Sequence, residues 1–276
     1  MLKDVTLGQF FPGNSLLHKT DPAVKILCSI AYIVAVFLAK SAAAYGLLFL
    51  FSLLLAIISG IPVKTLIKSL KPLLLVVVIT SVINIFWYAA GEDETALLSF
   101  WKINVYTGGI ISAAYMIVRI VCLIIGTSVI LTYTTSPIAL TDALERLLSP
   151  LKVIKLPVHE FSMMMTIAMR FIPTLIEETD KIMSAQKARG ADFSSGGVIK
   201  RAKSLIPILI PLFISAFRRA DELAVAMECR LYRGGEGRTK MTVTRLSLRD
   251  VLLPLMIAAF IFGTVMINKY LPQFTL

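Results

Sequence analysis

The sequence has little charge. Only 16% of its 276 residues are Asp, Glu, Lys or Arg, whereas 57% are hydrophobic and the mean hydropathy is +0.81. A soluble domain of this length needs far more polar residues to cover its surface. The composition therefore excludes an ordinary soluble protein and favours a chain that is embedded in lipid.

Residues that catalyse reactions or bind metals are also scarce. The chain has three cysteines and two histidines, and they form no CxxC pair or cluster in the sequence: Cys28, Cys122, Cys229, His18 and His159. This spacing argues against a disulfide framework or a metal site. No HExxH motif, Ser/His/Asp set or intramembrane carboxylate pair is present, and GGEGRTK at 234–240 lacks the spacing of a phosphate-binding loop. We therefore predict a protein that is not an enzyme and holds no cofactor.

Long apolar runs dominate the remaining sequence. A stretch of about 20 apolar residues is long enough to cross the hydrocarbon core of a bilayer. Five runs are candidates, at 23–39, 42–60, 73–90, 108–133 and 251–268. The fold class predicted is an all-α integral membrane protein with five transmembrane helices. Its predicted parts are an N-terminal segment 1–22, a four-span region 23–133, a charged helical region 134–250 and a terminal span 251–276.

The distribution of basic residues orients the chain. The net charge is +11, and most Lys and Arg lie before the first run, between the second and third runs, or within 134–250. Lys40, Lys102, Lys269 and the acidic stretch 91–94 would lie on the other side. Because basic loops stay in the cytoplasm, we expect a multi-pass protein of the cell membrane with a cytoplasmic N-terminus, a cytoplasmic 134–250 region and an external C-terminus.

The basic residues are not interleaved with aromatics on a polar scaffold, which argues against nucleic-acid binding. An acidic protein partner in the cytoplasm fits the same charge.

Arg119 lies in the middle of the fourth run. A charge at that depth is costly, so its side chain should face protein or a polar defect. It could form a substrate or proton site. The favoured alternative is a structural pair with a polar neighbour such as Asn84 or with a backbone carbonyl.

The 134–250 region reads as one short and two long amphipathic helices. The short helix follows Ser136 and Pro137 within 135–157, and the long ones cover 159–189 and 200–232. Each long helix carries an apolar seam suited to packing against another helix. The seams are Phe161, Met165, Ala168, Ile172, Leu175, Thr179, Ile182 and Gln186 on the first, and Leu205, Leu209, Leu212, Ala216, Ala220, Leu223, Met227 and Arg230 on the second. The apolar stretch 204–217 is too short for a span and is a plausible contact surface for another membrane protein.

Both long helices end on an arginine. Arg189 is followed by Gly190, and Arg230 stands 41 residues further on in a weakly similar stretch. One interpretation is ordinary helix capping, in which the cation offsets the helix dipole and the glycine adopts a left-handed conformation. The other is that each tip presents a fixed guanidinium to an acidic pocket.

The stretches AQKARGADF at 185–193, AMECRLYRGGEGRTKM at 226–241 and MRFIPTLIEE at 169–178, with the four leading spans and the terminal span, resemble a known family. The chain is similar to the transmembrane T component (EcfT) of energy-coupling factor transporters, which import vitamins and other micronutrients. The resemblance implies two coupling helices whose Arg-containing tips each dock on one of two ABC-type ATPase subunits (EcfA and EcfA'). These partners, not the T component, bind ATP. It also implies an apolar platform for a membrane-embedded substrate-binding S component.

The resemblance assigns roles to particular residues. The first docking motif carries over to Ala188, Arg189 and Gly190, whereas the second falls on Cys229, Arg230 and Leu231, two of which depart from the family pattern. Because leucine adopts a left-handed conformation poorly, we predict that the second helix continues to Tyr232 and Arg233 and ends at Gly234. Arg230 is then the first candidate for docking and Arg233 the alternative. The platform is assigned to Met164, Met165, Leu205, Ile206, Leu209, Leu212 and Phe213.

The function predicted is a non-enzymatic subunit that couples ATP hydrolysis in partner chains to uptake. The alternative is a self-sufficient secondary transporter or channel. That alternative calls for polar residues clustered at mid-membrane or paired broken helices. Within the predicted spans, Arg119 and Asn84 are too few polar residues to suggest a substrate site at mid-membrane.

Overall fold

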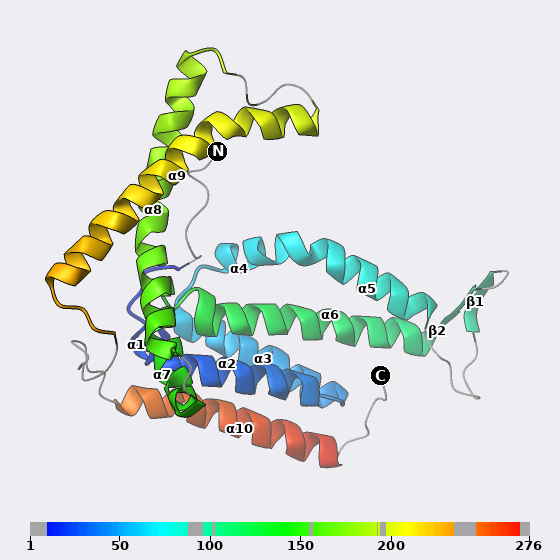
Figure 1. Ribbon diagram of the computed structural model, residues 1–276. Coiled ribbons are helices and arrows are strands. Elements are labelled where there is room, and N and C mark those ends of the chain that lie inside the picture. Colours follow the sequence, from blue (N-terminus) through cyan, green and yellow to red (C-terminus); the bar gives the residue numbers. More distant parts are fainter. Residues whose placement is uncertain are drawn as a thin grey trace. The chain divides into compact units, whose positions relative to one another are not determined.

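The computed structural model describes residues 10–87, 96–100, 103–154, 157–191, 193, 197–234 and 247–270 (Figure 1). They fall into two compact units, which are described separately. The bundle comprises the described residues of Gly8–Ser136 and Thr244–Leu276, and the arm unit comprises those of Pro137–Val243. The acidic stretch 91–94, Lys102 and most of the glycine-rich stretch 234–240 lie outside the described residues, so expectations for them remain predictions. The predicted domain limits likewise remain predictions.

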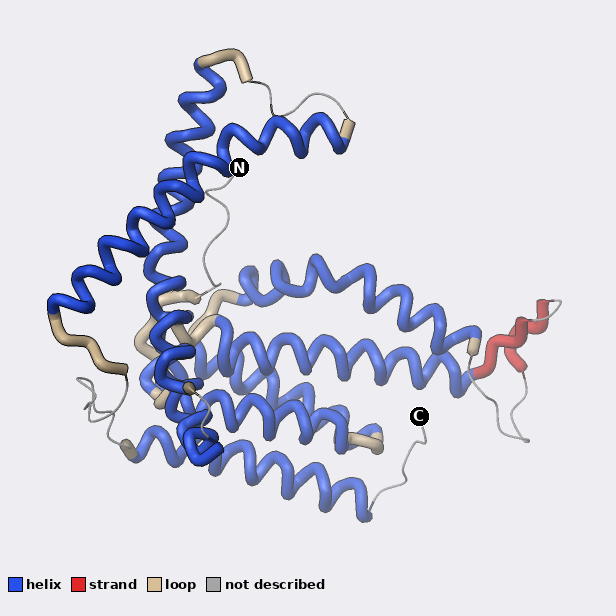
Figure 2. Tube along the Cα trace, in the orientation of Figure 1, coloured by secondary structure: helices blue, strands red, loops and turns tan. Residues whose placement is uncertain are grey.

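The bundle is built from apolar helices that lie side by side (Figure 1). Helix α6 contacts α2, α3 and α5, and α10 contacts α2 and α3. Figure 2 shows that helices make up almost all of the described chain, apart from an antiparallel pair of short strands, which the sequence did not lead us to expect. The elements are α1 (Leu16–Lys19), α2 (Pro22–Leu38), α3 (Ala42–Ser59), α4 (Val63–Leu70), η2 (Lys71–Leu73), α5 (Leu74–Phe86), β1 (Ala96–Phe100), β2 (Ile103–Tyr106), α6 (Thr107–Thr127), the π-helical turn η3 (Ser128–Thr132) and α10 (Leu248–Tyr270).

Helix length and composition fit an integral membrane protein. Four described helical stretches are long and apolar enough to cross a bilayer: Ala42–Ser59, Val63–Phe86, Thr107–Thr132 and Leu248–Tyr270. The third expected run begins earlier than predicted, because α4 and η2 continue directly into α5. Pro22–Leu38 is apolar but shorter, with 17 residues. An essentially all-helical membrane protein is thus confirmed, and the count of five spans stays a prediction.

The core of the bundle forms around Tyr32. Its side chain is fully buried, and its hydroxyl donates a hydrogen bond to the Cys122 carbonyl oxygen at 2.8 Å. The ring packs against Phe51 and Phe260 at centroid distances of 6.1 and 6.2 Å. It also lies directly over Gly126, where an added Cβ would stand 2.3 Å from the tyrosine ring. Small residues allow this kind of close approach between membrane helices.

Arg119 takes the structural role that the sequence favoured. Its Nη2 donates to the Ala39 carbonyl oxygen at 3.1 Å and to the Tyr45 hydroxyl, and its guanidinium lies 5.4 Å from the centre of the Tyr45 ring. The expected pairing with a backbone carbonyl is therefore confirmed. Pairing with Asn84 is wrong, because the Asn84 amide donates to the Thr80 carbonyl of its own helix at 3.0 Å. Since Ala39 is the C-cap of α2, the cation also faces the negative end of a helix dipole.

Lys25 is a buried cation, and its burial was not predicted from the sequence. Lys25 is 1% exposed, and its Nζ donates to the Thr134 carbonyl at 2.9 Å and the Thr135 hydroxyl at 3.3 Å. Nearby, the buried Asp250 carboxylate accepts the N–H groups of Asp21 at 2.6 Å and Ser247 at 2.7 Å. These contacts tie the start of α2 to the end of η3 and to the start of α10.

The arm unit consists of α7 (Pro137–Leu148), the 3-10 turn η4 (Ser149–Ile154), α8 (Val158–Ala188) and α9 (Val198–Cys229). Helix α8 contacts both α7 and α9. The two long helices cross, and their C-terminal ends lie far from each other (Figure 1). One short and two long helices were predicted here, and all three are present.

Replacing Gly126 tests the packing of the bundle. We expect Gly126→Ala to destabilise the protein by about 1–3 kcal/mol, the usual cost of overpacking, because its methyl group would overlap the Tyr32 ring. The measurement is the thermal melting temperature of the purified protein in detergent. Gly46→Ala in α3 is the matched control, since an added Cβ there meets no heavy atom of the described chain within 4 Å apart from its chain neighbours and the nearby backbone of its own helix. Equal melting temperatures for the two variants would contradict this packing.

Candidate functional site

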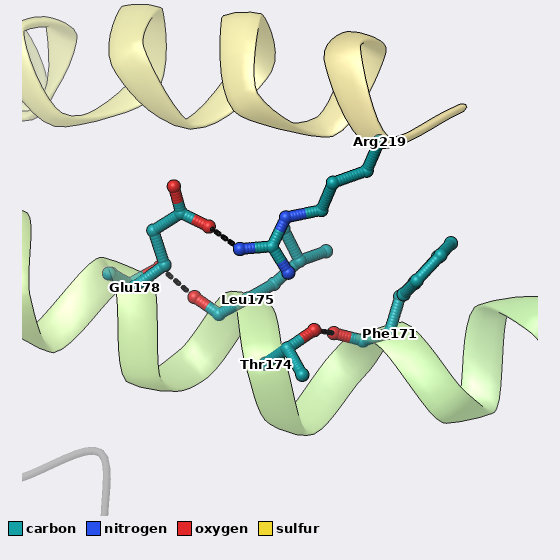
Figure 3. A network of polar contacts seen from close by, with 6 residues as sticks. Phe171, Thr174, Leu175, Glu178 and Arg219 are labelled. Atoms are coloured by element: carbon teal, nitrogen blue, oxygen red, sulfur yellow. Dashed lines mark hydrogen bonds and ion pairs between the residues drawn. The ribbon is translucent and has the colours of Figure 1, made fainter. Parts of the chain in front are cut away.

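The crossing of α8 and α9 sets the geometry of the arm unit. Arg219 Nη2 lies 2.5 Å from Glu178 Oε2, and Figure 3 shows Arg219 reaching from α9 across to the Glu178 carboxylate on α8. The side chains are 34% and 23% exposed, so water screens this pair only in part. Neither residue was singled out in the sequence, although opposite charges on two predicted helices could have suggested the pair.

The predicted seams are correct only in part. On α8, the seam residues Leu175, Thr179 and Ile182 are half-buried, but Phe161 is 50% exposed. On α9, Leu205 and Leu209 are exposed and Ile208 is buried instead. The predicted seam is therefore wrong at Leu205 and Leu209, whereas Leu212 and Ala216 are half-buried. Because 204–217 is apolar on every side, its periodicity could not identify the buried face.

The tip of α8 is closed by a Schellman motif. The helix ends at Ala188, Arg189 is the C-cap, and Gly190 has a positive φ of 85°. The Ala191 N–H donates to the Gln186 carbonyl at 3.0 Å, and the Gly190 N–H donates to the Lys187 carbonyl at 2.9 Å. This pair of bonds satisfies carbonyls that the last helical turn leaves free.

The tip of α9 repeats this closure 41 residues later. Its helix ends at Cys229, and Arg230 is the C-cap. The Tyr232 N–H donates to the Met227 carbonyl at 3.1 Å, and the Leu231 N–H donates to the Glu228 carbonyl at 2.8 Å. Leu231 has a φ of +53° and so occupies the position that Gly190 fills in α8. The prediction that α9 continues to Gly234 is therefore wrong, because leucine does adopt the left-handed conformation here.

All residues predicted for docking are accessible, but they lie at two separate places. The first group is at the end of α8 and the second at the end of α9 (Figure 1). The exposed residues are Ala188, Arg189, Gly190, Cys229, Arg230, Leu231 and Arg233. Arg189 and Arg230 occupy equivalent C-cap positions, whereas Arg233 stands three residues beyond its cap. The geometry therefore makes Arg230, not Arg233, the counterpart of Arg189.

The residues predicted for the platform are mostly uncovered. Leu205, Ile206, Leu209 and Phe213 of α9 are between 46% and 61% exposed, and Leu212 is half-buried. On α8, Met164 is 58% exposed and Met165 is half-buried. The exposed surface of α9 extends further than predicted, over Ile210, Ile214 and Phe217. An apolar surface of this extent is typical of a protein or membrane contact.

Whether the described residues could hold a metal ion depends on their His, Cys, Asp and Glu side chains. In the ranges that the structure describes, no group of three or more His, Cys, Asp or Glu residues could hold a metal ion. What the tips and the apolar face offer is charge and contact area.

Comparison with known proteins identifies the family. The family model for CbiQ, described as cobalt transport protein, matches residues 13–241. Relatives described as energy-coupling factor transporter transmembrane protein EcfT include one from Ruminiclostridium cellulolyticum that is 55% identical over 92% of this chain and 93% of its own. The chain belongs to the EcfT family.

Two further EcfT relatives show how complete the match is. The Acidaminococcus fermentans protein is 52% identical over 95% of this chain and 96% of its own length. The Bacillus subtilis protein is 48% identical over 87% and 89%, respectively. Membership of the EcfT family makes the chain a transmembrane component of an energy-coupling factor transporter in the cell membrane, as its sequence motifs predicted.

Charge reversal tests the α8–α9 crossing. We expect Glu178→Arg to oppose Arg219 with a like charge and to destabilise the crossing by about 1 kcal/mol, because the pair is partly exposed. Faster amide hydrogen exchange in α8 and α9 around the crossing would report this. Glu177→Arg is the matched control, since it makes the same charge change at an exposed neighbouring position. The exchange rates should recover in the doubly swapped variant Glu178→Arg with Arg219→Glu. No recovery would refute the pairing.

Proposed function

We propose that the chain is the energy-coupling scaffold of an ATP-driven importer of a vitamin or another micronutrient. Two ABC-type ATPase subunits dock on the tips of α8 and α9, and a membrane-embedded S component that binds the substrate rests on the apolar face of the arm unit. The observation that carries this proposal is that Arg189 and Arg230 stand at the same position of two identically closed helix ends.

The closure of each tip suits its arginine to docking. Backbone N–H groups after each cap already bond two carbonyls of the last turn, and both arginine side chains are exposed, so each guanidinium is open to a partner. Arginine also offers a planar set of donors that matches a carboxylate. At the first tip the contact surface comprises Ala188, Arg189 and Gly190. At the second it comprises Cys229, Arg230 and Leu231, with Arg233 as the alternative cation.

The apolar face of α9 supports the second contact. Five apolar residues of this surface lie within nine positions of α9, and two methionines of α8 add flexible apolar side chains. They are Leu205, Ile206, Leu209, Leu212 and Phe213 on α9, and Met164 and Met165 on α8. Methionine-rich apolar surfaces adapt to different partners. We assign this face to the S component, with lipid covering the outward sides of the bundle helices.

The scaffold needs no catalytic residue or cofactor of its own, because the ATPase partners bind and hydrolyse ATP. In this proposal five helices cross the membrane, the N-terminus and the arm unit are cytoplasmic, and the C-terminus is external. A self-sufficient transporter is disfavoured, since Arg119 is bound to the Ala39 carbonyl and the Tyr45 hydroxyl. The chain makes no nucleic-acid contact in this account.

Charge reversal at the tips tests the proposal. We expect Arg189→Glu and Arg230→Glu each to weaken co-purification of the ATPases by about tenfold or more, since losing a charged partner in an interface costs about 2–5 kcal/mol. Affinity capture of the full chain from membranes, with the ATPases quantified, is the measurement. Arg201→Glu is the control, because Arg201 is exposed on α9 far from its tip. Purification of a solitary chain that transports substrate by itself would refute the proposal. A loss seen only with Arg233→Glu would move the second contact from Arg230 to Arg233.

Cys229 provides an independent probe of the second tip. Cys28 and Cys122 are buried, whereas Cys229 is exposed beside Arg230. We expect a hydrophilic maleimide to label the isolated chain at Cys229 and to label it at least several-fold more slowly once the ATPases are bound. Peptide mass spectrometry measures the labelling, and Cys229→Ser controls for background. Equal rates in the free and assembled protein would place the ATPases elsewhere.

A further inference from the structure

Leu231 adopts a conformation that its residue type disfavours. It is the sole non-glycine residue with a positive φ in the part of the chain that the structure describes. In the left-handed region the Cβ of an L-residue crowds the following carbonyl, so helices that end this way usually place glycine there. Glycine occupies the equivalent position in α8, at Gly190.

The leucine side chain contributes little to the fold of its own chain. It is 76% exposed, so little of its apolar surface is removed from water. Replacing it with glycine would relieve the backbone and leave the two capping hydrogen bonds in place. Because the strained backbone at Leu231 is not offset by burial of its side chain, we look for a role of that side chain in contact with a partner.

The two tips also differ in the chemistry around their arginines. The last turn of α8 carries Lys187 beside Arg189, whereas the corresponding residue in α9 is Glu228. Gln186 of the first tip likewise corresponds to Met227 of the second. Among charged residues, the last turn of α8 thus carries only cations, whereas the last turn of α9 carries Glu228 before Arg230 and is followed by the exposed Leu231.

We infer that Leu231 determines which ATPase subunit docks on α9, by placing its side chain in an apolar pocket beside the acidic contact of Arg230. This inference rests on the proposed docking function and goes beyond it, because it makes the two tips non-interchangeable. The partner at α8 needs an acidic groove that admits Gly190, and the partner at α9 needs a groove with one acidic and one apolar site.

The decisive variant is Leu231→Gly, because folding and binding should respond in opposite directions. The melting temperature of the chain should stay the same or rise, since glycine relieves the backbone. Affinity for one ATPase should fall by about tenfold, the effect expected for losing a buried leucine side chain, while affinity for the other stays within about threefold. The measurement is binding of each purified ATPase to the full chain in lipid nanodiscs. Leu231→Met, which keeps an apolar side chain of similar volume, should bind within about threefold of the original protein.

Arg230→Glu in the same assay separates this inference from the proposed function. If Arg230→Glu leaves binding unchanged, docking at this tip is wrong altogether. If Arg230→Glu weakens binding and Leu231→Gly does not, the docking stands and the role of Leu231 is refuted. Equal losses for both ATPases with Leu231→Gly would refute the selective role.

Discussion

The last turn of an α-helix leaves carbonyl groups without partners, and the way α8 and α9 satisfy theirs determines what the arm unit presents. Both helices close by hydrogen bonds that run back from the two residues after the C-cap. This closure places one exposed arginine, Arg189 or Arg230, at the same point of each helix. It also requires a left-handed residue directly after each arginine. The docking account, the equivalence of the tips and their difference at Gly190 and Leu231 all depend on this constraint.

The bundle obeys a related rule within an apolar environment. An unsatisfied polar group is expensive in lipid, and three long polar side chains of the bundle find partners on neighbouring elements. Tyr32 donates to the Cys122 carbonyl, Arg119 to the Ala39 carbonyl and Lys25 to the Thr134 carbonyl. Each bond joins α2, or the residue that caps it, to α6 or the residues that follow α6. These contacts fix the arrangement of the helices more specifically than apolar packing alone. An aliphatic side chain gains little hydrophobic free energy by exchanging a lipid contact for a protein contact.

The sequence allowed us to predict the helical membrane class, the approximate extent of most helices and the positions of both arginine tips, since these depend on composition and local capping signals. Predictions from the sequence were wrong or incomplete for features that depend on which residues come into contact in the folded chain. The end of α9 was missed because residue preference disfavours leucine at position 231, yet the capping bonds of the last turn impose that conformation. The seam was misplaced at Leu205 and Leu209 because 204–217 is apolar all round. The sequence left two partners open for Arg119, a polar neighbour such as Asn84 or a backbone carbonyl. It could not decide between them, because it does not show that the Asn84 amide bonds its own helix.

The central claim is that the two tips are separate docking points for two ATPase subunits. Site-specific photocrosslinking in membranes tests it most directly, with a photoreactive amino acid at Ala185, at the equivalent Ala226, or at Arg201 as an exposed control off the tips. Mass spectrometry of the adducts should find one ATPase captured from Ala185, the other from Ala226 and neither from Arg201. Failure of both tip positions to capture an ATPase, or the same adducts from all three positions, would contradict the account.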